Sequence, residues 1–196
     1  MDFYIVRHGQ TDFNTLGYYQ GCLLNPSLNE YGIEQAKRLR QKLSDNGISA
    51  DRIFSSPLRR AYETARRLTT VFSSMVIDAD LIEGDFGIAD GAIEEEIKTK
   101  LPEEYAKWKD LDNLQFAFQN GQSKEEIGLR MSRALWNIYH HYNNLNNVLI
   151  VSHSCAIRCL LLQLGIKEEN IPFGTIYHLQ INTTDFSSLK FIERID

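Results

Sequence analysis

The sequence predicts an α/β protein in three layers, with helices on both faces of a doubly wound, mostly parallel sheet. Short apolar runs alternate along the chain with longer segments whose apolar residues recur every three or four positions. Two of the apolar runs, at residues 4–6 and 147–151, end close to a histidine. Because 196 residues, 43% of them hydrophobic, can bury a substantial core, we expect residues 1–196 to form a single domain.

The chain opens with a strand, a loop and a helix. The strand at residues 4–6 runs into Arg7-His8-Gly9, and a polar loop follows over residues 11–25. Asn29 is a candidate N-cap for a helix that Asn46-Gly47 should end. The residues expected on its buried face are Ile33, Ala36, Leu39 and Leu43.

A second strand and a second helix are predicted next. The strand at residues 51–54 leads to Ser56, which can cap a helix, and to Pro57, which suits the first helical position. Arg60 then lies in the first turn, and another short strand is expected at residues 75–78. The apolar side of this helix should contain Leu58, Ala61, Ala65, Leu68 and Phe72.

Residues 84–122 have a mixed, less regular pattern. We interpret them as a largely helical insertion that covers the sheet edge and could act as a substrate lid. Its aromatic residues could line an apolar pocket, although aromatic side chains more often belong to ordinary core. They are Tyr105, Trp108, Phe116 and Phe118.

The last part of the chain continues the alternation. Residues 123–126 fit a capping box at the start of a long helix, and the strand at 147–152 precedes a helix at 155–164. Alternating residues at 175–181 and 189–195 predict a terminal hairpin. Its turn should be Thr184-Asp185-Phe186-Ser187.

Composition and charge exclude several functions. A formal net charge of −5 argues against a nucleic-acid-coating surface. No apolar run is long enough to span a bilayer, and no secretory leader is visible, so we expect a cytoplasmic protein without a membrane partner. Cys22, Cys155 and Cys159 are expected to be reduced. Cys155 and Cys159 share a helical face, but without further ligands they are expected to be small buried residues rather than metal ligands.

The carboxyl ends of three predicted strands should meet at one edge of the sheet. They lead to His8, to Ser55-Ser56 and to His153, and helices begin after at least two of them. Helix N-termini carry partial positive charge, to which Arg7 and Arg60 would add two guanidinium groups. A dianionic phosphoryl group is the ligand that suits such an arrangement best.

The motifs together resemble the histidine phosphatase superfamily, also called phosphoglycerate mutase-like, and its phosphatase members in particular. They occur in the family's order and cover most of the chain, thinning across the insertion and the tail. The matching residues are Arg7-His8-Gly9 with Thr11 and Asn14, Gln20-Gly21, Leu28-Asn29-Glu30 with Gly32 and Gln35-Ala36, Ser56-Pro57-Leu58-Arg59-Arg60-Ala61 with Thr64-Ala65, Leu81-Ile82-Glu83 with Phe86-Gly87, and Val151-Ser152-His153.

This resemblance implies a phosphoglycerate mutase-like fold and a mechanism for cleaving small-molecule phosphate esters. His8 would be the nucleophile that becomes phosphohistidine, and Glu83 would be the proton donor and then the base. Arg7, Arg60 and a protonated His153 would bind the phosphoryl oxygens. No metal or cofactor is implied. The expected substrate-binding residues are Asn14, Gln20, Gly21 and Ser154.

Several of these assignments have rivals. Arg59 competes with Arg60 for the phosphate, and Asp85 and Asp90 compete with Glu83 as the acid. We expect Arg158 to form a structural ion pair rather than to bind phosphate. The two other histidine positions, His140-His141 and His178, are expected to face solvent and to have no evident partner, respectively.

The chain also departs from the family's common pattern, which leaves the substrate open. The departures are Gln10, Ser154, Ala89-Asp90-Gly91 and Gln122. The insertion offers Lys98, Lys100, Lys107 and Lys109 but no paired arginines, which favours hydrolysis over a mutase reaction. A cofactor-dependent phosphoglycerate mutase and a non-catalytic phosphate-binding module remain alternatives, and the sequence does not determine the oligomeric state.

Overall fold

The computed structural model describes residues 1–69, 75–182 and 188–196. These residues form an α/β fold around a six-stranded mixed sheet with the order β3-β2-β4-β1-β5-β6, which confirms the predicted fold class. The central strands β1 and β4 pair in parallel, as do β2 with β4 and β2 with β3, whereas β5 and β6 are antiparallel. The strands are β1 Asp2–Arg7, β2 Arg52–Ser55, β3 Met75–Ile77, β4 Asn147–Ser152, β5 Ile176–Gln180 and β6 Lys190–Ile195.

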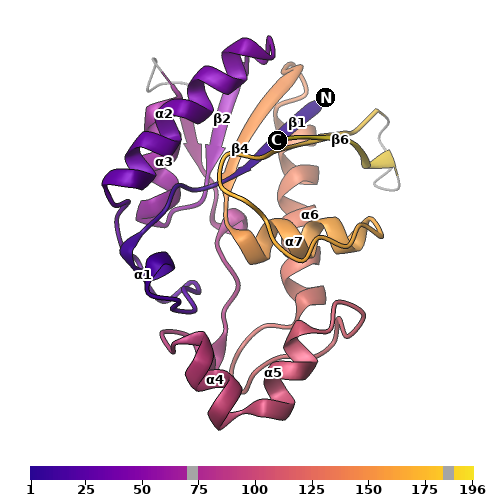
Figure 1. Ribbon diagram of the computed structural model, residues 1–196. Coiled ribbons are helices and arrows are strands. Elements are labelled where there is room, and N and C mark those ends of the chain that lie inside the picture. Colours follow the sequence, from indigo (N-terminus) through magenta and orange to yellow (C-terminus); the bar gives the residue numbers. More distant parts are fainter. Residues whose placement is uncertain (70–74, 183–187) are drawn as a thin grey trace.

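Helices cover both faces of the sheet, as Figure 1 shows. The helices α2 (Glu30–Asp45) and α3 (Arg59–Leu68) lie on one face, where Leu39 and Ala61 pack with Val6 and Val151. On the other face lie α6 (Lys124–His141) and α7 (Ser154–Gln163). Side chains of β1 point to both faces of the sheet. Phe3 and Ile5 pack in the core under α6 and α7, and Val6 packs in the core under α2 and α3.

The register of the central strands places the two histidines that follow β1 and β4. In the β1–β4 pair, Arg7 lies opposite Ser152, and the backbone N–H of His8 donates to the Ser152 carbonyl at 3.0 Å. In the β2–β4 pair, Ser55 lies opposite Val151. His8, Ser56 and His153 therefore leave three neighbouring strands at the same edge, as the sequence predicts.

Side-chain capping explains the starts of α2 and α6. The Asn29 side chain accepts from the Gly32 backbone N–H, and the capping box of Ser123 and Glu126 begins α6, both as predicted. The helix α3 differs, because it begins at Arg59 instead of Pro57, after an N-cap at Leu58 without a side-chain hydrogen bond. The hydroxyl of Ser56 binds the Leu58 N–H and the His153 ring instead of capping a longer helix.

Two further differences lie in the first loop and in the second helix. The loop at residues 11–25 contains a short helix, α1 (Asp12–Thr15), which the sequence analysis did not predict; Thr11 and Asn14 form its capping box. Phe72, which was expected in the second helix, lies outside the described residues.

The expected insertion is less helical than predicted, and it lies beyond the carboxyl ends of the parallel strands rather than over an edge strand (Figure 1). It contains a 3₁₀ turn at Gly87–Ala89 and the helices α4 (Glu94–Lys100) and α5 (Pro102–Lys109), followed by a non-helical segment up to Ser123. Aromatic packing orders it: the Trp108 ring centroid lies 5.6 Å from that of Phe86 and 5.4 Å from that of Phe118. Of the four aromatic residues expected to be core or pocket lining, Trp108 and Phe118 are core, and Tyr105 and Phe116 are half-buried and pack against it.

The C-terminal hairpin forms as predicted, with β5 and β6 antiparallel. The predicted turn at residues 184–187 lies outside the described residues. His178 has partners that the sequence analysis did not name, since its Nε2 lies 2.7 Å from Asp2 Oδ1 and its ring stacks on Tyr4. No helix within the described ranges combines the length and the apolar character needed to cross a membrane.

Candidate active site

The two strand-end histidines lie side by side. The ring centroids of His8 and His153 are 5.0 Å apart, and both side chains are buried. Arg60 joins them from the first turn of α3, where its Nε donates to His8 Nε2 at 3.2 Å. The structure therefore brings together three residues that are separated by more than 50 positions in the chain.

The hydrogen bonds of His8 define its tautomer. Its Nδ1 lies 2.7 Å from the Gly9 carbonyl oxygen, which can only accept, so Nδ1 carries the hydrogen. Its Nε2 is the acceptor for Arg60. Burial, followed by the positive charges of Arg60 and Arg7, holds the pKa of His8 well below its usual range. The ring is therefore neutral, with a lone pair on Nε2.

The surroundings of His153 disfavour the imidazolium that the resemblance implied. Burial and then the charge of Arg60 hold the pKa of His153 well below its usual range. Its Nε2 lies 2.7 Å from Ser56 Oγ, whereas its buried Nδ1 has no hydrogen-bond partner among the described residues. Sequence reasoning could not reveal this state, because it depends on the guanidinium that the fold places nearby.

Arg60 is fully buried and also holds the loop of residues 20–24. Its Nη1 donates to the Leu24 carbonyl at 2.7 Å, and its Nη2 lies 3.2 Å from the carbonyl oxygens of both Gln20 and Gly21. Burial lowers the pKa of Arg60 to about 10, which leaves it charged at neutral pH. Its rival Arg59 is exposed and pairs with Glu63 at 2.7 Å, away from the histidines.

Arg7 approaches from the end of β1. Its Nη1 donates to the Ile171 carbonyl at 2.9 Å, and its guanidinium carbon lies 3.9 Å from the centroid of the Phe173 ring. Its Nε is buried without a hydrogen-bond partner among the described residues. Arg7 thus retains donor capacity beside His8.

Glu83 lies at the N-terminus of α7. Its carboxylate accepts from the backbone N–H groups of Gly84, Cys155 and Ala156 at 2.9, 3.1 and 2.9 Å. Its carbonyl oxygen accepts from Arg130, which also binds the carbonyl oxygens of Asp80 and Ile82. These bonds fix the position of the carboxylate against the cavity.

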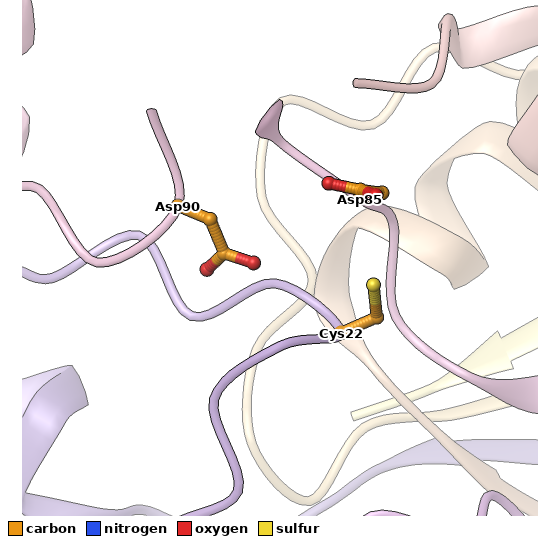
Figure 2. Close-up of side chains that lie close together, drawn as sticks. All are labelled: Cys22, Asp85 and Asp90. Atoms are coloured by element: carbon orange, nitrogen blue, oxygen red, sulfur yellow. The ribbon is translucent and has the colours of Figure 1, made fainter. Parts of the chain in front are cut away.

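The two rival carboxylates accept hydrogen bonds from the backbone instead. Asp85 accepts from the Gly87 N–H, and Asp90 accepts from the N–H groups of Gly21 and Leu23. With Cys22 they form a cluster whose possible ligand atoms lie within 4.8 Å of one another. Figure 2 shows the three side chains of this cluster. Because both carboxylates already hold loops through backbone N–H groups, we assign no metal to this cluster.

A cavity of about 230 Å³ opens beside these groups. Of the expected substrate-binding residues, Asn14, Gln20 and Ser154 line it, whereas Gly21 does not. Gly21 acts behind the cavity, where its N–H binds Asp90 and its carbonyl oxygen binds Arg60. The lining residues are Arg7, His8, Asn14, Tyr18, Tyr19, Gln20, Glu83, Phe86, Glu94, Trp108, Lys109, Ser154, Cys155, Arg158 and Asn170.

Two of the expected residues provide amide groups to the cavity. The Gln20 Oε1 accepts from Thr11 Oγ1 at 2.8 Å, which leaves its buried Nε2 without a partner among the described residues. The Asn14 Oδ1 accepts from the Thr11 backbone N–H at 3.0 Å. Both side chains are therefore oriented by Thr11 with their oxygen atoms already engaged.

Sequence reasoning missed part of the lining. It expected an ion pair for Arg158, but that side chain forms none with the described residues and lies in the cavity wall. The helical spacing of Ser154 and Arg158, four residues apart on α7, was the available signal. No local signal marked Tyr18 or Asn170, because they reach the cavity only through tertiary packing.

The chain is similar to several known proteins. Phosphoserine phosphatase 1 from Hydrogenobacter thermophilus is 36% identical over 184 residues, covering 88% of this chain and 84% of that protein. A 2,3-bisphosphoglycerate-dependent phosphoglycerate mutase from Bartonella tribocorum is 29% identical, covering 85% and 83%. The structure of a mycobacterial glucosyl-3-phosphoglycerate phosphatase with VO3 superposes with a TM-score of 0.79 at 26% identity, covering 91% and 92%.

The family model for the histidine phosphatase superfamily (branch 1) matches residues 3–194. This match includes the strands that end at His8 and His153 and the helix that contains Arg60. The chain is therefore a member of branch 1 of the histidine phosphatase superfamily.

Proposed function

We propose that this protein is a phosphomonoesterase that hydrolyses small phosphate esters through a phosphohistidine on His8. The observation that carries the proposal is the state of the His8 ring: neutral, with its hydrogen on Nδ1 bound by Gly9 and its Nε2 lone pair beside Arg60. A nucleophilic imidazole needs this state. Its phosphatase relatives support the reaction class.

In the first step, His8 Nε2 attacks phosphorus in line with the ester oxygen. The N–P bond forms as the P–O bond to the leaving group breaks, and Glu83 gives a proton to the leaving oxygen. Arg60, which donates to Nε2 in this structure, would exchange that bond for a phosphoryl oxygen. Arg7 Nε, Gln20 Nε2 and His153 Nδ1 supply further donors, since none of these atoms has a hydrogen-bond partner among the described residues.

In the second step, water attacks phosphorus while Glu83 accepts its proton. The N–P bond breaks, its electrons return to His8 Nε2, and inorganic phosphate leaves. Asn14 and Ser154 line the same cavity and are proposed to contact the substrate. We also propose that residues 84–122 act as a lid, because Phe86, Glu94, Trp108 and Lys109 from this segment form part of the wall.

The lid composition supports hydrolysis over the mutase reaction. Lys98 and Lys100 pair with Glu95 and Glu96 on the surface of α4, so they are not directed at a substrate. Of the four lysines in the insertion, Lys109 lines the cavity. A single lysine from the insertion is not the added basic segment that the mutase reaction is expected to require.

Turnover of p-nitrophenyl phosphate without added metal tests the proposal. His8→Ala should lower kcat by at least about a thousandfold, since the nucleophile is removed. The matched control is His141→Ala, an exposed histidine at the end of α6, which should keep full activity. Equal activity in His8→Ala would refute the assignment of the nucleophile.

The alternatives give different results. A non-catalytic phosphate-binding module would bind phosphate esters without releasing phosphate from any of them. A mutase given 3-phosphoglycerate and a trace of the bisphosphate would yield 2-phosphoglycerate, whereas the proposed phosphatase should yield inorganic phosphate. An acid-labile phosphoryl group on the wild type, absent from His8→Ala, should be trapped by rapid alkaline quenching.

A further inference from the structure

Arg158 is a cation in the cavity wall that the proposed chemistry does not use. It lies on α7 and lines the cavity together with Ser154 and Cys155. Its Nη1 donates to the Glu169 carbonyl at 3.3 Å, and its Nη2 lies 3.7 Å from Cys155 Sγ. The Glu169 carbonyl is an uncharged acceptor, whereas the hydrogen bond with Cys159 and the charge of Arg158 lower the pKa of the Cys155 thiol. A guanidinium has five N–H donors, so most of its donor capacity remains.

The charge of Arg158 also lacks a close counterion. Within the described part of the chain, no carboxylate lies within 4.0 Å of Arg158, whereas Lys109 in the same wall has Glu94 at 3.8 Å. Its Nε is buried without a partner among those residues. Burial disfavours the charged guanidinium, but Cys155, Cys159 and Glu83 outweigh this effect and raise the pKa of Arg158. Arg158 is therefore charged, and a carboxylate that reached this point of the wall would meet N–H donors that no carboxylate of the described residues occupies.

The position of Arg158 indicates which part of a substrate it would meet. Four residues separate it from Ser154, which places its Cα about 6 Å further along the helix axis from the strand ends. The phosphoryl group belongs at those strand ends, beside His8 and Arg60. Arg158 therefore faces the part of the cavity where the alcohol portion of the ester would lie.

The size of the cavity limits that alcohol. Tyr19, Phe86 and Trp108 contribute aromatic rings to the lining, and the whole cavity has a volume of about 230 Å³. Pockets for drug-sized ligands usually measure about 300 to 1,000 Å³. The leaving group that fits is therefore small, and it should carry a negative charge for Arg158.

Resting on the proposed function, we propose that Arg158 binds a carboxylate on the leaving group, so that the preferred substrates are phosphate esters of small hydroxy acids. The planar guanidinium matches a carboxylate with two parallel hydrogen bonds. Arg158 is then a specificity-determining residue, distinct from the groups that bind the transferred phosphoryl.

Two matched substrate pairs test this assignment. O-phosphoserine differs from O-phosphoethanolamine only by its carboxylate, and 3-phosphoglycerate differs from glycerol 3-phosphate by a carboxylate in place of a hydroxymethyl group. The measured quantity is the ratio of kcat/KM within each pair, from phosphate release. The wild type should favour the carboxylate member of both pairs by about 10- to 100-fold, the value of a charge-assisted bidentate contact.

Arg158→Met should lower both ratios toward one, mainly through KM for the carboxylate substrates. Arg158→Lys keeps the charge without the planar fork, so its ratios should lie between those of wild type and Arg158→Met. The control is Arg38→Met, an exposed arginine of α2 near Glu34, which should keep the wild-type ratios. Thermal melting of each variant confirms that the compared proteins are folded.

The possible failures are distinguishable. Wild-type ratios near one, with all four esters hydrolysed, would overturn the role of Arg158 and leave the phosphatase proposal intact. Unchanged ratios in folded Arg158→Met, with every substrate equally impaired, would instead assign Arg158 to the phosphoryl group and also overturn the inference. Absence of phosphate release from these esters and from p-nitrophenyl phosphate would refute the proposed function itself.

Discussion

The hydroxyl oxygen of Ser56 lies 2.7 Å from Nε2 of His153, at the ends of two neighbouring strands where both side chains are buried. The same oxygen accepts from the Leu58 N–H at 3.2 Å, so the hydroxyl hydrogen is available for His153 Nε2. A neutral His153 bound in this way carries its own hydrogen on Nδ1. In this tautomer, Nδ1 is the atom of His153 that can donate to a phosphoryl oxygen, as the proposed mechanism requires.

Ser56→Ala should lower kcat/KM for p-nitrophenyl phosphate by roughly 10- to 100-fold, because the His153 ring loses the bond that fixes its orientation. Ser44→Ala, at an exposed position of α2, is the matched control and should change nothing. Steady-state kinetics on the folded variants provide the comparison. Wild-type kinetics in Ser56→Ala would show that packing alone orients His153.

Arg60→Met should impair both catalysis and stability. The variant removes a charged donor near His8, which should lower kcat by about 100- to 1,000-fold. It also leaves buried carbonyl oxygens of residues 20–24 without their donor, which should reduce the free energy of unfolding by about 1 to 3 kcal/mol. Urea denaturation measures the second effect.

The neighbour of Arg60 offers the control. Arg59→Met removes an exposed ion pair with Glu63, whose contribution to stability should be at most about 1 kcal/mol. Its activity should match the wild type. Similar losses in the two variants would mean that the motif assigns the wrong arginine.

Stability should fall as the pH drops below the ordinary pKa of histidine. In the folded protein burial holds the pKa values of His8 and His153 well below that of an unfolded chain, so the unfolded state binds more protons just below about pH 6.5. Each histidine should then add about 1.4 kcal/mol of destabilisation per pH unit between its unfolded and folded pKa values.

Urea unfolding at a series of pH values from roughly 7.5 to 5 measures this slope. His8→Asn should show a smaller slope than the wild type, since one of the two linked groups is absent. His141→Asn, which replaces an exposed histidine, should retain the wild-type slope. Identical slopes in wild type and His8→Asn would contradict the buried, neutral state of His8.

Activity should persist after treatment with EDTA. The guanidinium groups of Arg7 and Arg60 supply the positive charge that the phosphoryl group requires, and the carboxylates of Asp85 and Asp90 hold backbone N–H groups. Cys22→Ala should also retain metal-independent turnover, because Cys22 does not line the cavity. Loss of turnover in EDTA, restored by a divalent cation, would contradict this prediction.

The sequence by itself determined the features that depend on local pattern. Apolar runs of strand length located β1 and β4, and the side chains of Asn29 and Ser123 with Glu126 marked two helix starts, because capping and periodicity act over a few residues. The topology of parallel strands then required His8 and His153 to emerge together.

Only the tertiary structure decided the features that depend on distance between remote segments. The neutral state of His153 follows from burial beside Arg60, and the place of Arg158 follows from how α7 meets the cavity. Gly21 belongs to the motif, but it does not line the cavity, and its carbonyl oxygen accepts from Arg60. A residue's charge state and its access to a cavity depend on neighbours that are distant in the chain, which no local pattern specifies.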